Sequence, residues 1–173
     1  ALEEKRSPVD MQLYQQIIGS LLYLTLRTRP DILAPVLILA RFQSSPTSYC
    51  HRAVKRVMRY LRGTSKFRME YKVGETNLQA YVDADYAGDS VDRKSMSGYL
   101  VKSGNAMFSW GARKQSAVAL STCEAEYYAM TMATQELIWL RRVMEEAGQK
   151  VEMDTPLRSD NQGAISWARG ERC

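Results

Sequence analysis

The stretch LQAYVDADYAGD, residues 78–89, decides both the fold and the chemistry that this sequence predicts. Apolar and polar residues alternate from Leu78 to Asp85, which is the pattern of a β-strand with one buried face. Residues two apart on a strand share a face, so Asp83 and Asp85 lie on one side and Val82 lies on the other. Carboxylates this close repel one another unless a positive group lies between them. A basic side chain, a metal ion or only water therefore accompanies these acids.

Turn residues separate this strand from a further series of elements, which are strands near 97–104 and 106–110, a long helix at 121–147 and a strand near 155–162. Strands followed by a helix and another strand predict an α/β fold in which helices pack on a mixed sheet. We expect this domain to occupy residues 76–173. A sheet that has just received a strand is normally covered by more chain than remains here, so we expect the fold to be incomplete at its C-terminus.

Residues 1–75 predict a small helical segment that precedes the sheet. Apolar residues recur at helical spacing after Asp10, a candidate N-cap, again after Pro30, and in a third helix at 44–63. The third helix carries a stripe of basic residues at steps of three and four, which are Arg52, Lys55, Arg56, Arg59 and Arg62. Its packing side is predicted to be Val54, Val57, Met58 and Leu61.

The positive charge of the chain is concentrated around this third helix. Eight basic residues stand against one acid between Cys50 and Lys72, a net charge of +7, whereas the whole chain carries +5 and the remainder therefore −2. A stripe of this kind is either a solvated helix face or a contact surface for a polyanion. We expect the five stripe residues to contact nucleic-acid phosphates, which position a substrate without reading its sequence.

Two further acids are candidates to join Asp83. Steps of three and four from Glu126 along the long helix reach only apolar or small residues, so Glu126 lies at the end of the face that packs on the sheet. Glu124 has capping-box spacing to Ser121 and is expected to face solvent. Asp160 ends the last predicted strand, and sites in α/β sheets gather at the carboxyl ends of strands.

Three carboxylates without histidine or cysteine are typical ligands of Mg²⁺ or Mn²⁺, and two such ions can hold both reacting oxygens of a phosphodiester. The alternative is that these acids are ordinary strand-end and turn residues, with Asp160 and Asn161 as an N-cap pair.

A zinc site is excluded because the chain has three cysteines and one histidine in no ligand spacing. No apolar run is long enough to cross a membrane, and three cysteines without a secretory signal indicate a reducing compartment.

Several consecutive motifs carry a resemblance to a known family. The segment from YVDADYAGD at residue 81 to CEAEYYAM at 130, followed by SDNQGAI at 159–165, resembles the ribonuclease H region of Ty1/copia-type retrotransposon polyproteins. The upstream YQQIIGSLLYLTLRTRPDI and HRAVKRVMRYLRGT resemble the segment that joins reverse transcriptase to ribonuclease H in the same family.

The resemblance implies a ribonuclease H-like fold that cuts the RNA strand of an RNA–DNA hybrid with two divalent ions. Asp83, Glu126 and Asp160 match the family's catalytic and metal-binding acids. Ser97 and Asn161 are candidates for hydrogen bonds to sugar hydroxyls, the group that distinguishes RNA. The implied partners are an RNA–DNA hybrid and the remainder of the polyprotein, including reverse transcriptase and integrase, in a cytoplasmic particle or in the nucleus.

The chain also departs from the family pattern. The family supplies a fourth acid from a later strand and helix, which this sequence does not reach, and the paired aspartates of the polymerase are missing, which excludes DNA synthesis by this chain alone. The alternative function is therefore an inactive, truncated retroelement remnant that binds nucleic acid or serves only as a structural fragment.

Overall fold

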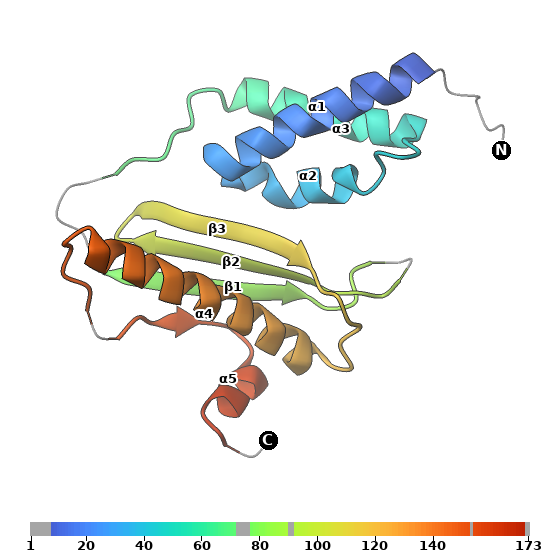
Figure 1. The fold of residues 1–173 in the computed structure, drawn as a ribbon. Coiled ribbons are helices and arrows are strands. Elements are labelled where there is room, and N and C mark those ends of the chain that lie inside the picture. The colour runs from blue at the N-terminus through green and yellow to red at the C-terminus, as the bar shows by residue number, and fades with distance from the viewer. Residues whose placement is uncertain (1–7, 72–76, 90–91, 153, 172–173) are drawn as a thin grey trace. The chain divides into compact units, whose positions relative to one another are not determined.

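The computed structural model describes residues 8–71, 77–89, 92–152 and 154–171, and the chain divides into two compact units, residues 1–68 and 69–173 (Figure 1). A hydrophobic cluster of buried helix residues fills the first unit, and two clusters between sheet and helices fill the second. Each unit thus has a core of its own, as a domain does.

The described residues of the first unit form three α-helices and one 3-10 turn, which are α1 (Pro8–Arg27), η1 (Pro30–Ile32), α2 (Leu33–Ala40) and α3 (Ser48–Gly63). The prediction of Asp10 as an N-cap is wrong, because α1 already begins at Pro8 and Asp10 lies in its first turn. Thr47 caps α3, and its Oγ1 accepts a hydrogen bond from the backbone N–H of Cys50 at 3.2 Å. Nowhere in the described ranges is a helix both long and apolar enough to cross a lipid bilayer.

The core of the first unit joins all three α-helices. Tyr14 of α1 is fully buried, and its hydroxyl donates a hydrogen bond to the carbonyl oxygen of Leu39 at 2.8 Å. Burial is the main cause that raises the pKa of Tyr14 to about 12. Val54 and Val57 of α3 are buried as predicted, whereas Met58 is 47% exposed. The prediction for Met58 is wrong because one residue turns a helix by about 100°, which carries it off the packing face.

The second unit is built on a four-stranded sheet with the strand order β3-β2-β1-β4. Its strands are β1 (Leu78–Asp85), β2 (Met96–Ser103), β3 (Ala106–Lys114) and β4 (Leu157–Arg158). β2 is antiparallel to both β1 and β3, while β4 is parallel to β1. The helix α4 (Thr122–Glu146) packs across β1 and β2, and α5 (Gln162–Ala168) packs against α4 (Figure 1). The prediction of an α/β fold with a mixed sheet and packed helices is confirmed.

Small side chains bring α4 close to the sheet. Ala125, Ala129 and Ala133 recur every four residues along α4 and are all fully buried. Ala129 and Ala133 share a core cluster with Val82 of β1, so their small side chains allow the helix to pack closely on the strand there. The stripe predicted from Glu126 is the buried face of α4, which comprises Ala125, Glu126, Ala129, Met130, Ala133, Leu137 and Leu140.

The last strand is shorter than the sequence predicts. Only Leu157 and Arg158 of β4 pair with β1. Asn161 then caps α5, and its Oδ1 accepts a hydrogen bond from the backbone N–H of Ala164 at 2.9 Å. The position of the strand is predicted correctly but its length is not, because a side chain that caps a helix competes with continuation of the ladder.

Candidate metal centre

Two of the three predicted acids are brought together by the parallel pairing of β1 and β4. Tyr81 of β1 is paired in register with Arg158 of β4. Asp83 and Asp160 each follow two residues later along their segments, so both reach the same edge of the sheet. Both side chains are exposed.

The third acid comes from the N-terminal turns of α4. The Oγ of Ser121 accepts a hydrogen bond from the backbone N–H of Glu124 at 3.1 Å, and the Glu124 carboxylate accepts one from the backbone N–H of Leu120 at 2.7 Å. These contacts fix the start of the helix and give Glu124 the structural role that its spacing predicts. Glu126, two residues further on, is only 6% exposed.

The structure brings these three acids into one cluster. Asp83, Glu126 and Asp160 each offer one carboxylate oxygen, and these oxygens all lie within 4.8 Å of one another. Oxygen ligands of one Mg²⁺ lie about 2.1 Å from the ion, so small rotations of the two exposed aspartates bring all three into its coordination shell. An all-oxygen donor set of this kind fits a hard divalent cation.

Glu126 is the acid of the cluster whose ionised form is disfavoured by its surroundings. Its Oε1 accepts a hydrogen bond from the backbone N–H of Ala84 at 3.3 Å, whereas its buried Oε2 has no hydrogen-bond partner among the residues that the structure describes. Burial is the main cause that raises the pKa of Glu126, and the charges of Asp83 and Asp160 raise it further against the opposing effect of the Ala84 hydrogen bond. A divalent cation bound among the three carboxylates would offset two of their three negative charges.

The other acids of residues 78–89 have different surroundings. Asp89 is 5% exposed and forms an ion pair with Lys114, which also pairs with Asp92 at 2.7 Å. Asp85 lies against Gly88, where an added Cβ would come 1.8 Å from the Asp85 Oδ2. Thus a lysine is the positive neighbour of Asp89, and the cluster around Asp83 has no such neighbour among the ion pairs of the described residues.

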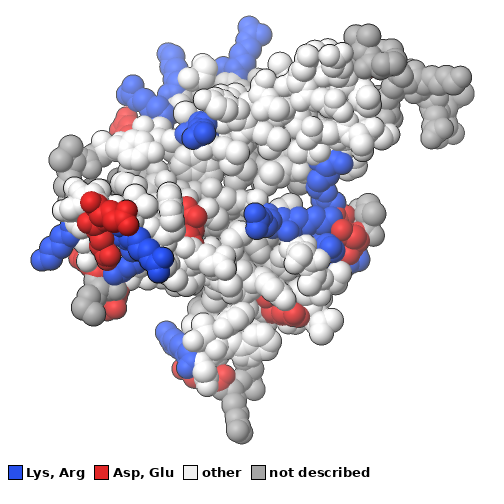
Figure 2. All heavy atoms as spheres, viewed as in Figure 1, with Lys and Arg blue, Asp and Glu red and all other residues white. Residues whose placement is uncertain are grey.

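The residues predicted to bind nucleic acid are distributed over both units. The basic stripe of α3 is exposed along its whole length in the first unit, and Figure 2 shows Lys and Arg side chains gathered where Figure 1 places the C-terminal part of α3. Ser97, in the second unit, is 3% exposed, and its Oγ accepts a hydrogen bond from Gln115 at 2.8 Å. A contact between Ser97 and a sugar would require Gln115 to move, and Asn161 already uses its Oδ1 to cap α5.

Sequence reasoning did not find Gln115, which connects two elements near the acid cluster. Its Nε2 donates hydrogen bonds to Ser97 Oγ at 2.8 Å and to the carbonyl oxygen of Ala125 at 2.9 Å, the residue that precedes Glu126. The Lys114 ion pairs were also missed, because basic residues at a strand end are typical of a solvated turn. The only indication in the sequence that Lys114 has acidic partners is the presence of three aspartates within residues 85–92.

Curated proteins with similar sequences include transposon polyproteins. Secreted RxLR effector protein 161 of Plasmopara viticola is 44% identical over 128 residues, which are 73% of this chain and 90% of the effector. The retrovirus-related Pol polyprotein from transposon TNT 1-94 of Nicotiana tabacum is 40% identical over 168 residues, 97% of this chain and 12% of the polyprotein. That from transposon RE1 of Arabidopsis thaliana is 40% identical over 152 residues, 87% of this chain and 10% of the polyprotein. No protein-family model and no solved structure matches the sequence significantly.

Fold and acid cluster define an α/β protein with a candidate divalent-metal centre, attached to a helical unit. The chain belongs to the family of segments found in retrovirus-related Pol polyproteins of copia-type transposons, which also includes Secreted RxLR effector protein 161. The resemblance to a retrotransposon polyprotein is therefore confirmed. The chain spans about a tenth of the length of these Pol polyproteins.

Proposed function

We propose that residues 76–173 are a ribonuclease H-like domain that hydrolyses the RNA strand of RNA–DNA hybrids, attached to the connection segment of a retroelement reverse transcriptase in residues 1–75. The observation that carries the proposal is the meeting of Asp83, Glu126 and Asp160, with one buried oxygen of Glu126 lacking a partner among the described residues. The same three residues match the catalytic acids that the family resemblance implies.

Each acid has a distinct role in the proposed reaction. Asp83 and Asp160 present exposed carboxylates that would hold two Mg²⁺ or Mn²⁺ ions and orient the scissile phosphate, while the hydrogen bond from Ala84 keeps Glu126 turned toward them. When bound, the ions supply positive charge for the phosphate and lower the pKa of water. The residues on the buried side of Glu126 exclude bulk water there, which strengthens every charge interaction at the centre.

The basic stripe of α3 would supply sequence-independent affinity for the hybrid. Its five side chains are exposed and lie on one helix, so they can follow a phosphate backbone. The remaining parts of the proposed assembly are reverse transcriptase and integrase from the same polyprotein, in a cytoplasmic particle or in the nucleus.

A cleavage assay tests this function. We expect the chain to cleave a labelled RNA–DNA hybrid with Mg²⁺ or Mn²⁺, and Asp83→Asn to lose cleavage while hybrid binding remains. Glu124→Gln is the matched control, because Glu124 lies on the same helix turn as Glu126 but accepts a backbone hydrogen bond that glutamine can also accept. Cleavage that survives in Asp83→Asn would contradict the proposal.

A second candidate is an inactive module that binds nucleic acid or serves only as a structural fragment. The observation in its favour is that this chain covers 90% of Secreted RxLR effector protein 161, whose name describes a secreted effector. A segment of this family therefore occurs outside a Pol polyprotein. Binding of the hybrid without cleavage would support the inactive module, and neither activity would support the structural fragment.

A further inference from the structure

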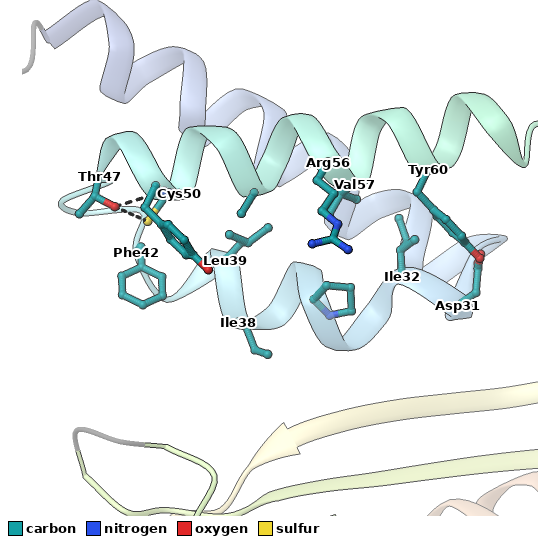
Figure 3. Close-up of a pocket in the computed structure, with 13 residues that line it drawn as sticks. Asp31, Ile32, Ile38, Leu39, Phe42, Thr47, Cys50, Arg56, Val57 and Tyr60 are labelled. Carbon is teal, nitrogen blue, oxygen red and sulfur yellow. Dashed lines mark hydrogen bonds between the residues drawn. The ribbon is translucent and has the colours of Figure 1, made fainter.

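A groove of about 760 Å³ runs between α2 and α3 of the helical unit (Figure 3). One wall carries Pro35 and Ile38 of α2 and Phe42 of the turn that follows α2, and the other carries Tyr49, Ala53, Arg56 and Tyr60 of α3. The α3 residues recur at steps of three and four, so they project from a single helix face. The buried Cys50 and Val57 of the core also line the groove, whereas the buried Val54 does not.

The length of the groove and the spacing of the residues along it are those expected of a site that binds an α-helix. The α3 wall extends from the N-cap Thr47 to Tyr60, fourteen residues that span about 20 Å at 1.5 Å per residue, or between three and four helical turns. The spacing of the α3 residues 49, 53, 56 and 60 is that of alternating a and d positions in a coiled coil.

Large apolar side chains are exposed to solvent along this groove. Ile38 is 49% exposed, Phe42 42%, Tyr49 71% and Tyr60 44%. Contiguous exposed apolar surface of this kind marks an interaction site more often than isolated surface residues do. Aromatic residues and arginine are also the types that contribute most to binding energy at protein interfaces.

The charges in the groove specify the partner further. Asp31, at one end, is neutralised by Arg29, whose Nη2 lies 2.6 Å from the Asp31 Oδ2, and this hydrogen bond is the main cause that lowers the pKa of Asp31. Arg56 lies midway along α3 with its guanidinium directed toward α2 (Figure 3). No described residue forms a hydrogen bond or an ion pair with Arg56. The groove is therefore apolar with one uncompensated positive charge near its centre.

We propose that this groove binds an amphipathic α-helix of a partner protein, with apolar residues at a and d spacing and an acidic residue opposite Arg56. The apolar residues of such a helix would pack into the groove between α2 and α3. Its carboxylate would form an ion pair with the guanidinium of Arg56, beside the apolar side chains of the groove. The proposal concerns the helical unit alone and is independent of the candidate metal centre. It assigns Arg56 to the groove, so the other four basic residues of the stripe are the ones that would contact phosphates.

Fluorescence anisotropy with synthetic peptides tests this proposal on the full chain. The probe is a labelled helical peptide of about 15 residues, long enough to span the groove, with leucine at its a and d positions and one glutamate beside the central leucine. Two matched peptides carry glutamine or lysine in place of that glutamate. We expect the glutamate peptide to bind about 10-fold more tightly than the lysine peptide, because charge complementarity selects the partner.

Three variants separate the contribution of the charge from that of the apolar walls. Arg56→Met keeps an apolar stem of similar length, so we expect it to bring the affinities of the glutamate and lysine peptides to within about 3-fold of each other while binding persists. Arg52→Met is the matched control, since Arg52 is exposed on the same helix but does not line the groove, and it should leave the discrimination unchanged. Ile38→Asp should abolish binding of all three peptides, with circular dichroism showing that the helices remain.

Three results would overturn the proposal. The first is that none of the peptides binds. The second is equal affinity for the glutamate and lysine peptides in the unmodified chain. The third is that the chain sediments as a dimer which Ile38→Asp dissociates, because the groove would then be occupied by a second copy of the chain.

Discussion

The backbone N–H of Ala84 donates a hydrogen bond to Glu126 Oε1 at 3.3 Å, which ties the acid of α4 to the strand that carries Asp83. One oxygen of Glu126 is thereby held by the protein. The other, Oε2, is buried and has no hydrogen-bond partner in the described part of the chain. The carboxylate therefore stays oriented toward the two aspartates despite the repulsion among three negative charges.

Divalent cations should stabilise the protein through this cluster. We expect Mg²⁺ or Mn²⁺ at a hundred times its dissociation constant to raise the free energy of unfolding by about 2.7 kcal/mol, because only the folded chain assembles the three acids. Glu126→Gln should remove most of this effect and stabilise the cation-free protein by about 1 kcal/mol, since an amide ends the charge repulsion. Thermal unfolding with EDTA and with added cation measures both changes. An equal stabilisation by cation in both proteins would contradict the assignment of the site.

The raised pKa of Glu126 predicts a specific pH dependence in the absence of cation. The folded-state pKa lies above the unfolded one, so Glu126 contributes stability below the unfolded pKa, and this contribution is lost as pH rises through the folded pKa. Stability in EDTA should therefore fall across that interval in the unmodified chain more than in Glu126→Gln. Cation affinity should rise over the same interval, because protons compete with the metal for the carboxylate. Urea unfolding at a series of pH values measures the first effect and calorimetric titration with Mn²⁺ the second.

The ion pair of Lys114 with Asp89 should be a major determinant of stability. Lys114→Met leaves the buried Asp89 without its lysine, and breaking a buried pair from one side costs about 3 kcal/mol. Asp92→Asn removes only the more exposed partner of the same lysine and should destabilise the protein less than Lys114→Met does. Urea unfolding of the two variants compares these costs. Equal destabilisation by the two substitutions would contradict the prediction that the pair with the buried Asp89 contributes more to stability than the pair with Asp92.

The basic stripe of α3 should determine the salt dependence of hybrid binding. We expect Arg52→Ala and Arg59→Ala each to weaken binding to an RNA–DNA hybrid regardless of its sequence and to reduce the slope of log affinity against log salt by about 1. Arg141→Ala is a matched control in the second unit, since Arg141 donates a hydrogen bond to Thr155 at 2.7 Å and is not part of the stripe. Unchanged affinity and unchanged slope in both stripe variants would exclude the stripe from the interface.

The sequence predicts the parts of the fold that depend on local periodicity. Alternation from Leu78 to Asp85 predicts β1 with its correct bounds, and steps of three and four from Glu126 predict the buried face of α4. Because those two patterns also place Asp83 and Glu126 on their elements, the candidate acids can be found before any coordinates are known.

Features that depend on pairing between distant residues cannot be predicted in this way. The register of β4 on β1, the ion pair between Lys114 and Asp89, and the hydrogen bonds of Gln115 each join residues far apart in the chain. The groove between α2 and α3 also escapes prediction. Its stripe at Tyr49 and Tyr60 has the same helical spacing as a core face, and only the packing of the helices in three dimensions shows that this stripe stays exposed.

The buried alanines of α4 have a consequence for the candidate metal centre, because their small side chains let α4, which carries Glu126, pack closely on the strand that carries Asp83. Enlarging Ala129 by even two carbons would wedge the helix outward and pull the acids apart, although every acid would still be in the sequence. A copy of this segment could thus lose the acid cluster through a substitution at a buried apolar position. The presence of all three carboxylates in its sequence would not reveal that loss.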